Sequence, residues 1–222
     1  RTLHGDVLFH NIIAEIPGIS RKFILIAAHY DIKRFNFIKD FQGANDGASG
    51  VAALLGMISA LQKYEGELPC GIKFVFFDGE ECIEEYGPAD GLHGSRRLAK
   101  EWSENGLLKK CRAMILLDMV GDKDLTITIP KGCTKSLIDR TLRLAQENGL
   151  GSRFRVFESD MIDDHVPFLE KGVPAIDLID FNYGPGNAFW HTTQDSLDKI
   201  SAQSIKTVAD FAFGLYWDIA ED

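Results

Sequence analysis

The sequence contains few cysteines and no long apolar segment. Only four of its 222 residues are cysteine, and no two form a CxxC pair, which argues against a zinc ribbon or a redox dithiol. We expect these four to be buried small apolar side chains, and we leave open one disulfide whose pairing the sequence does not assign: Cys70, Cys82, Cys111 and Cys133. No run approaches the ~20 apolar residues that cross a bilayer, so we expect no membrane span.

Clusters of Lys and Arg and several catalytic motifs are also missing. The net charge is −9, which argues against a nucleic-acid or anionic-membrane partner, because phosphate binding needs grouped positive charge. The sequence has no GxSxG elbow, no GxxxxGK[ST] loop, no GxGxxG after the first expected strand and no HEXXH motif. Cys82 is disfavoured as a nucleophile because the two carboxylates preceding it oppose a thiolate.

Length and composition favour one domain. A chain of 222 residues with 45% hydrophobic and 26% charged content predicts a single globular domain over residues 1–222. The chain begins at Arg1 with neither a methionine nor an apolar leader, so we expect a processed or truncated product.

Short apolar runs alternate with helix-like segments, which is typical of an α/β protein with a largely parallel, buried sheet. We expect strands over residues 7–16, 22–29, 72–78, 113–120, 125–129 and 174–180. We expect helices over residues 47–64, 94–104, 134–148, 164–171 and 202–218. The first two strands, joined by PGISRK, predict an edge hairpin. Three long irregular stretches are of a length that is usually functional: 30–46, 82–93 and 181–200.

Acidic and histidine side chains follow several of these expected strands. One such acid alone is as readily a helix cap or a turn former. Ligands of open α/β sheets, however, bind beyond the carboxyl ends of the strands, and five separate positions there offer His, Asp or Glu: His29 and Asp31; Asp46; Asp78, Glu80 and Glu81; Asp118; and His191. Carboxylate oxygens mixed with imidazole nitrogens, without thiolates, predict a catalytic zinc site.

Five segments, in this order, resemble peptidase family M28, a group of zinc aminopeptidases that also contains the animal-type glutaminyl cyclases: AAHYD (27–31), GANDGASGVAAL (43–54), FFDGEE (76–81), LLDMVGD (116–122) and WHTTQDSLDKIS (190–201). The resemblance implies a three-layer αβα sandwich around a mixed, mostly parallel sheet, with a metal site at the strand ends. It also implies a peptide or protein N-terminus as substrate, and it favours a secreted or periplasmic setting.

The resemblance implies different metal contents for the two branches. The aminopeptidases imply two zinc ions, with His29 and Asp118 on separate metals, Asp46 bridging, Glu81 and His191 completing the shells, and Glu80 as general base. The cyclases imply one zinc ion held by Asp46, Glu81 and His191. Glu80 would then carry a proton from the substrate amine to the leaving ammonia, helped by Asp118 and Asp163.

Residues around these motifs favour the cyclase branch. DGEECIEEYGPADGLHGSRRLA (78–99) and IDDHVPFLEKGVPAI (162–176) resemble cyclase segments, as does Trp190 directly before His191. The same resemblance implies Trp190 and Tyr86 as substrate-binding residues, Tyr86 standing where a pocket tryptophan is usual.

Two features resemble aminopeptidases instead: GANDGASGVAALL (43–55), and Ala28 where the cyclases have a disulfide cysteine. We therefore predict a zinc-dependent glutaminyl-peptide cyclotransferase, with a two-zinc aminopeptidase as the alternative. A binding protein of the same fold without catalysis is a third hypothesis, and the presence of every motif acid and histidine disfavours it.

The neighbouring glutamates suggest a division of labour. A tight turn at Gly79 would let Glu80 and Glu81 reach one site. Zinc would fix Glu81, whereas a like charge and burial would raise the pKa of Glu80 toward the range of a proton carrier. Among the remaining residues, we interpret His165 as an orienting or helix-starting residue. Asp195 and Asp198 are read as turn and capping residues, and Asp195 is also a candidate to orient the loop of His191.

Overall fold

The computed structural model describes residue 2 and residues 5–222. Its central sheet has the strand order β1-β3-β2-β4-β7. The strands are β1 (Ile12–Ile16), β2 (Ser20–His29), β3 (Cys70–Phe77), β4 (Cys111–Asp118) and β7 (Ala175–Ile179). Only β1 runs antiparallel to its neighbour, and the other three pairings are parallel. The prediction of a mixed, mostly parallel sheet is therefore confirmed.

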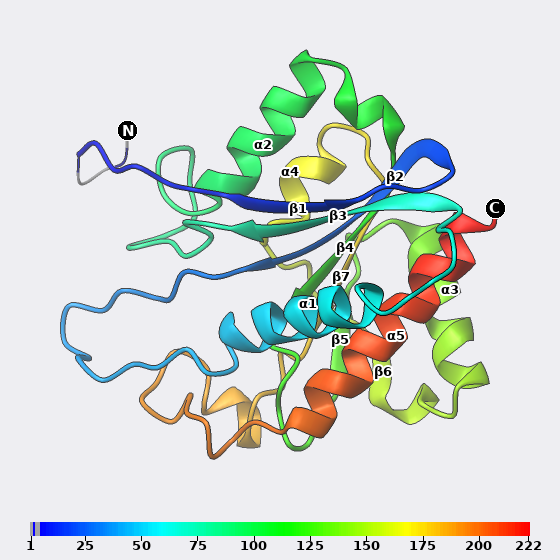
Figure 1. The fold of residues 1–222 in the computed structure, drawn as a ribbon. Helices are drawn as coiled ribbons and strands as arrows, with labels where there is room; N and C mark the ends of the chain where they lie inside the picture. The colour runs from blue at the N-terminus through cyan, green and yellow to red at the C-terminus, as the bar shows by residue number, and fades with distance from the viewer. Residues whose placement is uncertain (1, 3–4) are drawn as a thin grey trace.

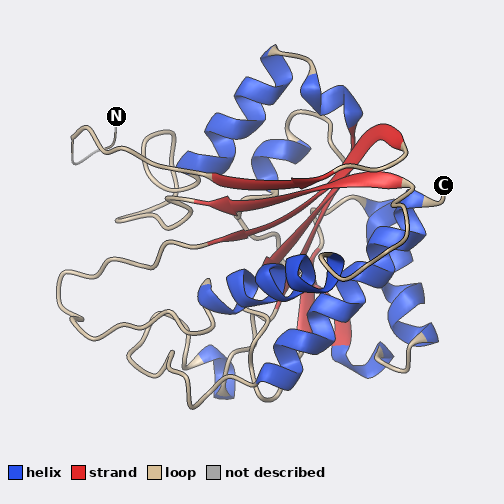
Figure 2. Ribbon diagram, viewed as in Figure 1, coloured by secondary structure: helices blue, strands red, loops and turns tan. Residues whose placement is uncertain are grey.

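Helices cover both faces of this sheet, which makes the predicted three-layer sandwich (Figures 1 and 2). In Figure 1, α2 and α4 lie above the sheet, and α1, α3 and α5 lie below it. The helices are α1 (Ala48–Leu61), α2 (His93–Glu104), α3 (Lys135–Glu147), α4 (Val166–Leu169) and α5 (Ala202–Ala220). Short 3-10 helices occupy Leu107–Lys110, Gly151–Arg153 and Pro185–Asn187.

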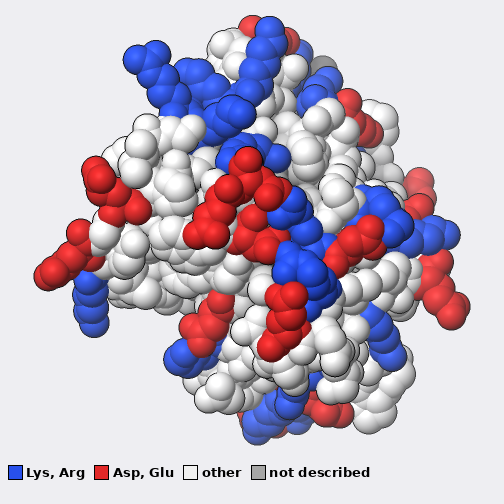
Figure 3. Space-filling model, turned by 90° about the vertical axis from the view of Figure 1, so that its right-hand side faces the viewer, with Lys and Arg blue, Asp and Glu red and all other residues white. Residues whose placement is uncertain are grey.

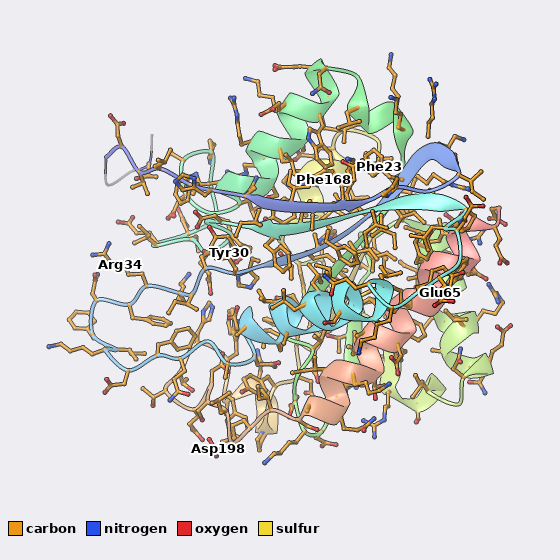
Figure 4. The ribbon with its side chains drawn as sticks, in the orientation of Figure 1. Phe23, Tyr30, Arg34, Glu65, Phe168 and Asp198 are labelled. Carbon is orange, nitrogen blue, oxygen red and sulfur yellow. The ribbon has the colours of Figure 1, made fainter. Side chains whose placement is uncertain are left out.

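The side chains of β2 alternate between the two faces of the sheet, which shows why helices cover both faces. Ile24 and Ile26 pack into the core that includes α1 and α5, whereas Phe23 and Leu25 pack into the core that includes Trp102 of α2. Phe23 belongs to the same core as Phe168 of α4, and both are labelled in Figure 4. Because successive side chains of a strand point to opposite faces, an unbroken apolar run buries apolar surface against both helix layers.

The predicted hairpin between the first two strands is wrong. β1 pairs with β3, and β2 lies between β3 and β4. The linker crosses the start of β3, where the Ile19 backbone N–H donates to the Leu68 carbonyl at 2.8 Å. A Cβ at Gly18 would lie 2.4 Å from the Cys70 carbonyl carbon, so only glycine permits this close crossing. Two strands that adjoin in sequence are therefore separated in the sheet.

The structure has a second, two-stranded sheet, and the sequence predicts only one of its strands. It pairs β5 (Ile127–Pro130) in parallel with β6 (Phe154–Phe157). The sequence predicts β5 but not β6, because FRVF is short, its two central residues are exposed, and it shows no clear period. The other strands and all five α-helices overlap the ranges expected from the sequence.

The four cysteines are buried, as predicted for small apolar side chains, and none of them forms a disulfide. No helix in the described part of the chain is both long and apolar enough to cross a bilayer. On the face at the amino ends of the parallel strands, Lys and Arg side chains are intermixed with Asp and Glu (Figure 3). One pair joins α3 to α5, with Arg140 Nη1 2.9 Å from Asp218 Oδ2.

Candidate active site

Polar side chains meet at the carboxyl ends of the parallel strands. His29 ends β2, Asp118 ends β4, and Glu80 and Glu81 follow β3. Asp46 lies just before α1. All five are buried, with at most 8% of each residue exposed. The loops after β2 and β3 extend from this edge, to the left in Figure 1. The parallel strands thus deliver their terminal side chains to one place, as expected for an open α/β sheet.

The turn after β3 directs both glutamates into the site. Gly79 has a φ of +72°, a backbone conformation that glycine adopts without strain. The two carboxylate oxygens of Asp31 each accept one backbone hydrogen bond, from Glu80 N and Glu81 N, both at 3.1 Å. Asp31 therefore fixes the turn that presents the adjacent side chains.

The first group of ligand atoms comes from Asp46, Glu81 and His191, and they lie within 4.8 Å of one another. His191 Nε2 is 3.2 Å from Asp46 Oδ2 and 3.3 Å from Glu81 Oε1. Burial alone would lower the pKa of His191, but the two neighbouring carboxylates raise it to about 9. The surrounding carboxylates therefore favour positive charge at this point.

A second group contains His29, Asp46 and Asp118. His29 and Asp118 therefore lie in one ligand group, and the expectation from the aminopeptidases that they bind separate metals is wrong. His29 Nε2 is 3.2 Å from Asp46 Oδ1 and 3.3 Å from Asp118 Oδ1. The other ring nitrogen, Nδ1, lies 3.1 Å from the backbone oxygen of Asp31, which suits a proton on Nδ1 and a free Nε2. Because Asp46 belongs to both groups, it stands where a bridging ligand between two ions would be.

The residues present fit a zinc ion. Within the described chain, both buried oxygens of Glu81 lack a hydrogen-bond partner, and only longer contacts face them: 3.3 Å to His191 Nε2 and 3.4 Å to Lys33 Nζ. Two carboxylates and one imidazole form a three-residue shell that leaves a position for water or substrate, as in catalytic zinc sites. Burying such a set without a cation would leave carboxylates facing one another.

A cavity of about 340 Å³ opens onto these groups. Its wall includes Trp190 and Tyr86, the two residues expected to bind substrate. The Trp190 ring stacks on His191, with centroids 4.0 Å apart, and meets Phe181 edge-on at 4.9 Å. Trp190 is therefore both a wall of the cavity and an anchor for the loop that carries His191.

Glu80 belongs to neither ligand group but lines the same cavity. Burial raises its pKa well above the usual range, although the charge of His29 opposes the shift; the carboxylates of Glu81, Asp164 and Asp118 add to it. The Tyr86 hydroxyl donates a hydrogen bond to Glu80 Oε1 at 2.8 Å. Glu80 is thus a buried carboxyl group that faces the cavity.

Asp118 and Asp163, the two other residues expected in catalysis, also line this cavity. Burial raises the pKa of both, most strongly for Asp163, where Asp177 and Asp118 add like charge. Asp163 forms a third group with Asp177 and His165. Burial lowers the pKa of His165 to about 4, so its ring is neutral near pH 7. Asp177 was not expected at the site because it lies inside a strand and not after its end, although an acid within an apolar run is itself an unusual feature.

Asp195 was expected to cap a helix or to orient the loop of His191, but its side chain has other partners. Its Oδ1 accepts hydrogen bonds from Asn45 N at 2.7 Å and from the Tyr183 hydroxyl at 2.9 Å, and its Oδ2 accepts one from Asp46 N at 3.2 Å. Asp195 therefore orients the loop of Asp46. The cap of α5 is Ser201, whose hydroxyl accepts from Gln203 N. Asp195 is not a cap.

We expect Asp195→Asn to weaken zinc binding by about 10-fold to 100-fold, the usual cost of losing a partner that orients a metal ligand. The amide keeps the size of the side chain but replaces one acceptor oxygen with a donor, which would face a backbone N–H. A competition titration with a chelating indicator measures the affinity. Asp198→Asn is the matched control, since Asp198 is exposed and, among the described residues, hydrogen-bonds with Ser196, Lys199 and Lys123 and not with Asn45 or Asp46. Equal zinc affinity in the two variants would contradict the role.

Comparison with known proteins places this geometry in a family. The model of peptidase family M28 matches residues 11–215. A Drosophila melanogaster glutaminyl-peptide cyclotransferase is 32% identical over 230 residues, covering 93% of this chain and 64% of the fly protein. The chain therefore spans a little less than two thirds of the length of that relative.

Two solved structures share the fold. An Acidobacteriales bacterium glutaminyl cyclase superposes with a TM-score of 0.93 at 36% identity, covering 99% of this chain and 76% of the other. A Zn-dependent exopeptidase from Parabacteroides distasonis has a TM-score of 0.80 at 26% identity, covering 97% and 80%. By its sequence and by its fold, this chain belongs to peptidase family M28.

Proposed function

We propose that this protein is a zinc-dependent glutaminyl-peptide cyclotransferase, which converts an N-terminal glutamine to pyroglutamate and releases ammonia. The observation that carries the proposal is the placement of Glu80. It is a buried carboxyl group outside the Asp46, Glu81 and His191 group, yet it lines the same cavity, whose wall also includes Trp190. The names of the fly relative and of the Acidobacteriales structure support the same activity.

The cavity suits a reaction within a single residue. The α-amine and the γ-carboxamide of an N-terminal glutamine belong to the same residue, so one small pocket can hold both reacting groups. Holding them together removes much of the entropic barrier. A bound zinc ion would polarise the γ-carbonyl and stabilise the negative charge that develops on it. Trp190 and Tyr86 would enclose the methylene groups and exclude water that competes with the amine.

Glu80 would move one proton during ring closure. The amine nitrogen forms a bond to the γ-carbonyl carbon, and Glu80 takes a proton from that nitrogen. The bond from the same carbon to the amide nitrogen then breaks, and Glu80 returns the proton to the departing group, which leaves as ammonia. Glu80 ends in its starting state. Asp118 and Asp163, which line the cavity with it, would hold the polar end of the substrate during the transfer.

A two-zinc aminopeptidase is the second candidate, and one observation favours it. His29, Asp46 and Asp118 form a complete second ligand group that shares Asp46 with the first. With both groups filled, Glu80 would instead take a proton from water, which would attack the first peptide bond. We propose one zinc ion per chain for the cyclase, whereas the aminopeptidase would hold two.

Product analysis separates the two reactions. The protein is incubated with zinc and with matched peptides that begin with Gln or Leu. We expect ammonia and a pyroglutamyl peptide from the Gln peptide, and no free amino acid from either. Free leucine, or free glutamine, would overturn the cyclase proposal in favour of hydrolysis. Zinc content measured on the same sample provides the metal count.

The substrate would be the free N-terminus of a peptide or protein. The rest of such a substrate would extend out of the cavity, whose wall includes residues 159–163. We propose a secreted or periplasmic setting, in keeping with the family resemblance.

A further inference from the structure

The only side chain in the described part of the chain that donates a hydrogen bond to the Glu80 carboxylate is Tyr86. Its hydroxyl lies 2.8 Å from Oε1. The other oxygen, Oε2, accepts no such bond from the described side chains. The two oxygens of Glu80 are thus in different environments, and Oε2 is the one left to exchange a proton with a substrate.

A compact loop holds Tyr86 in this position. The Asp90 carboxylate accepts backbone hydrogen bonds from the three residues that precede Tyr86, at 2.7, 2.8 and 3.3 Å: Ile83, Glu84 and Glu85. The far end of the loop returns to its start, where Leu92 N donates to the Glu80 carbonyl at 2.9 Å. Glu80 and Tyr86 are therefore joined through the backbone of one closed loop.

The aromatic ring is fixed as well as the loop. A Cβ at Gly91 would lie 2.5 Å from Tyr86 Cδ1, so the ring lies directly against the backbone of Gly91. Tyr86 also contributes to the cavity wall. Because ring and loop are both held in place, the hydroxyl reaches Glu80 in a preorganised direction, which is the condition for a useful contribution to catalysis.

We propose that Tyr86 is a positioning residue for proton transfer, whose hydroxyl holds Glu80 by Oε1 so that Oε2 faces the amine and the leaving nitrogen of the substrate. The role rests on the proposed proton transfer by Glu80. It adds to the expected contact of the Tyr86 ring with substrate, because the hydroxyl and the ring have separate functions. An aromatic wall alone needs no hydroxyl group.

The hydroxyl stays a donor throughout the reaction. Burial, followed by the charges of Glu80, Glu81 and Asp163, raises the pKa of Tyr86 far above its usual value. Tyr86 therefore keeps its own proton while Glu80 gains and loses one. It orients the carboxylate and does not carry the transferred proton.

Tyr86→Phe tests the hydroxyl and leaves the ring. We expect kcat for Gln peptides to fall by about 10-fold to 100-fold, as for loss of a hydrogen bond to a charged group in the transition state. KM should change by less than about two-fold, because the wall is intact. Tyr216→Phe is the matched control: it also removes a buried hydroxyl, one that donates to the Cys70 carbonyl, but far from the cavity. The Tyr216→Phe variant should keep the wild-type kcat and KM.

A double-mutant cycle with Glu80→Gln identifies the residue through which Tyr86 acts. If Tyr86 works through Glu80, adding Tyr86→Phe to Glu80→Gln should lower kcat by less than about two-fold. An undiminished effect in that background, or a single variant with wild-type kcat, would overturn the inference. A wild-type protein that releases leucine and no ammonia would instead overturn the cyclase, and the same cycle would then be measured on leucine release.

Discussion

Replacing Glu80 with glutamine is expected to lower kcat for an N-terminal Gln peptide by about 10³-fold, within the usual range for loss of a positioned proton carrier. The amide has nearly the same volume and keeps an oxygen that can accept from the Tyr86 hydroxyl. It cannot take up and return a proton. KM should change little, since the ligand group of Asp46, Glu81 and His191 is untouched. Coupled detection of ammonia measures the rate.

The stability of this variant provides an internal check. Because the pKa of Glu80 is raised in the folded protein, its ionisation destabilises the fold at pH values above the pKa of the unfolded chain. A neutral Gln should therefore leave the Tm unchanged or raise it at pH 7. Glu65→Gln is the control, on the loop between α1 and β3 at the other end of the sheet (Figure 4). Wild-type turnover by zinc-loaded Glu80→Gln would exclude Glu80 as the proton carrier.

Removing the metal is expected to have an effect at least as large. Chelation should lower kcat by at least about 10³-fold, because the site would lose several kcal/mol of stabilisation of the developing charge. Added zinc should restore turnover. The Tm should also fall on chelation, since a ligand that binds only the folded state stabilises it. Turnover and thermal unfolding are measured on the same apo and reloaded samples.

His191→Ala separates the metal site from other effects of the chelator. This variant should hold little zinc at concentrations that saturate the wild type, and zinc should not rescue its activity. His10→Ala is the control, because His10 is exposed and its side chain contacts neither ligand group. Full turnover by a zinc-free sample, verified by elemental analysis, would be incompatible with the proposed mechanism.

Much of the site follows from local patterns in the sequence. A parallel strand buried on both faces is recognisable as a continuous apolar run, and the polar residue that ends it lies at the carboxyl edge of the sheet whatever the strand order. This is why His29, Asp118 and Glu81 were expected near one another before their distances were known. Asp46 and His191, which come from loops, were expected there as well, and the resemblance to family M28 implied that they are metal ligands.

Strand order was less accessible from the sequence. β1 and β2 are neighbours in the sequence with a turn between them, and local rules favour a hairpin. In the structure β3 takes the place next to β1, because pairing depends on which strand edges the whole sheet leaves open. Gly18 is the one local feature that the crossing over β3 requires. A glycine beside a proline is equally typical of an ordinary turn, so it does not predict the crossing.

The sequence by itself determined the class of fold, the edge of the sheet where the chemistry lies and the residue types available there, because apolar periodicity and strand ends are local properties. The tertiary structure decided which carboxylates hold the backbone of the site residues in place by accepting their hydrogen bonds. Asp195 reaches Asn45 and Asp46 across 150 and 149 positions of the chain, and Asp31 reaches Glu80 across 49. Tyr86 is only six positions from Glu80, yet its hydroxyl reaches that carboxylate only because Asp90 closes the loop. Hydrogen bonds depend on direction and on distances of about 3 Å, and only the folded backbone sets both.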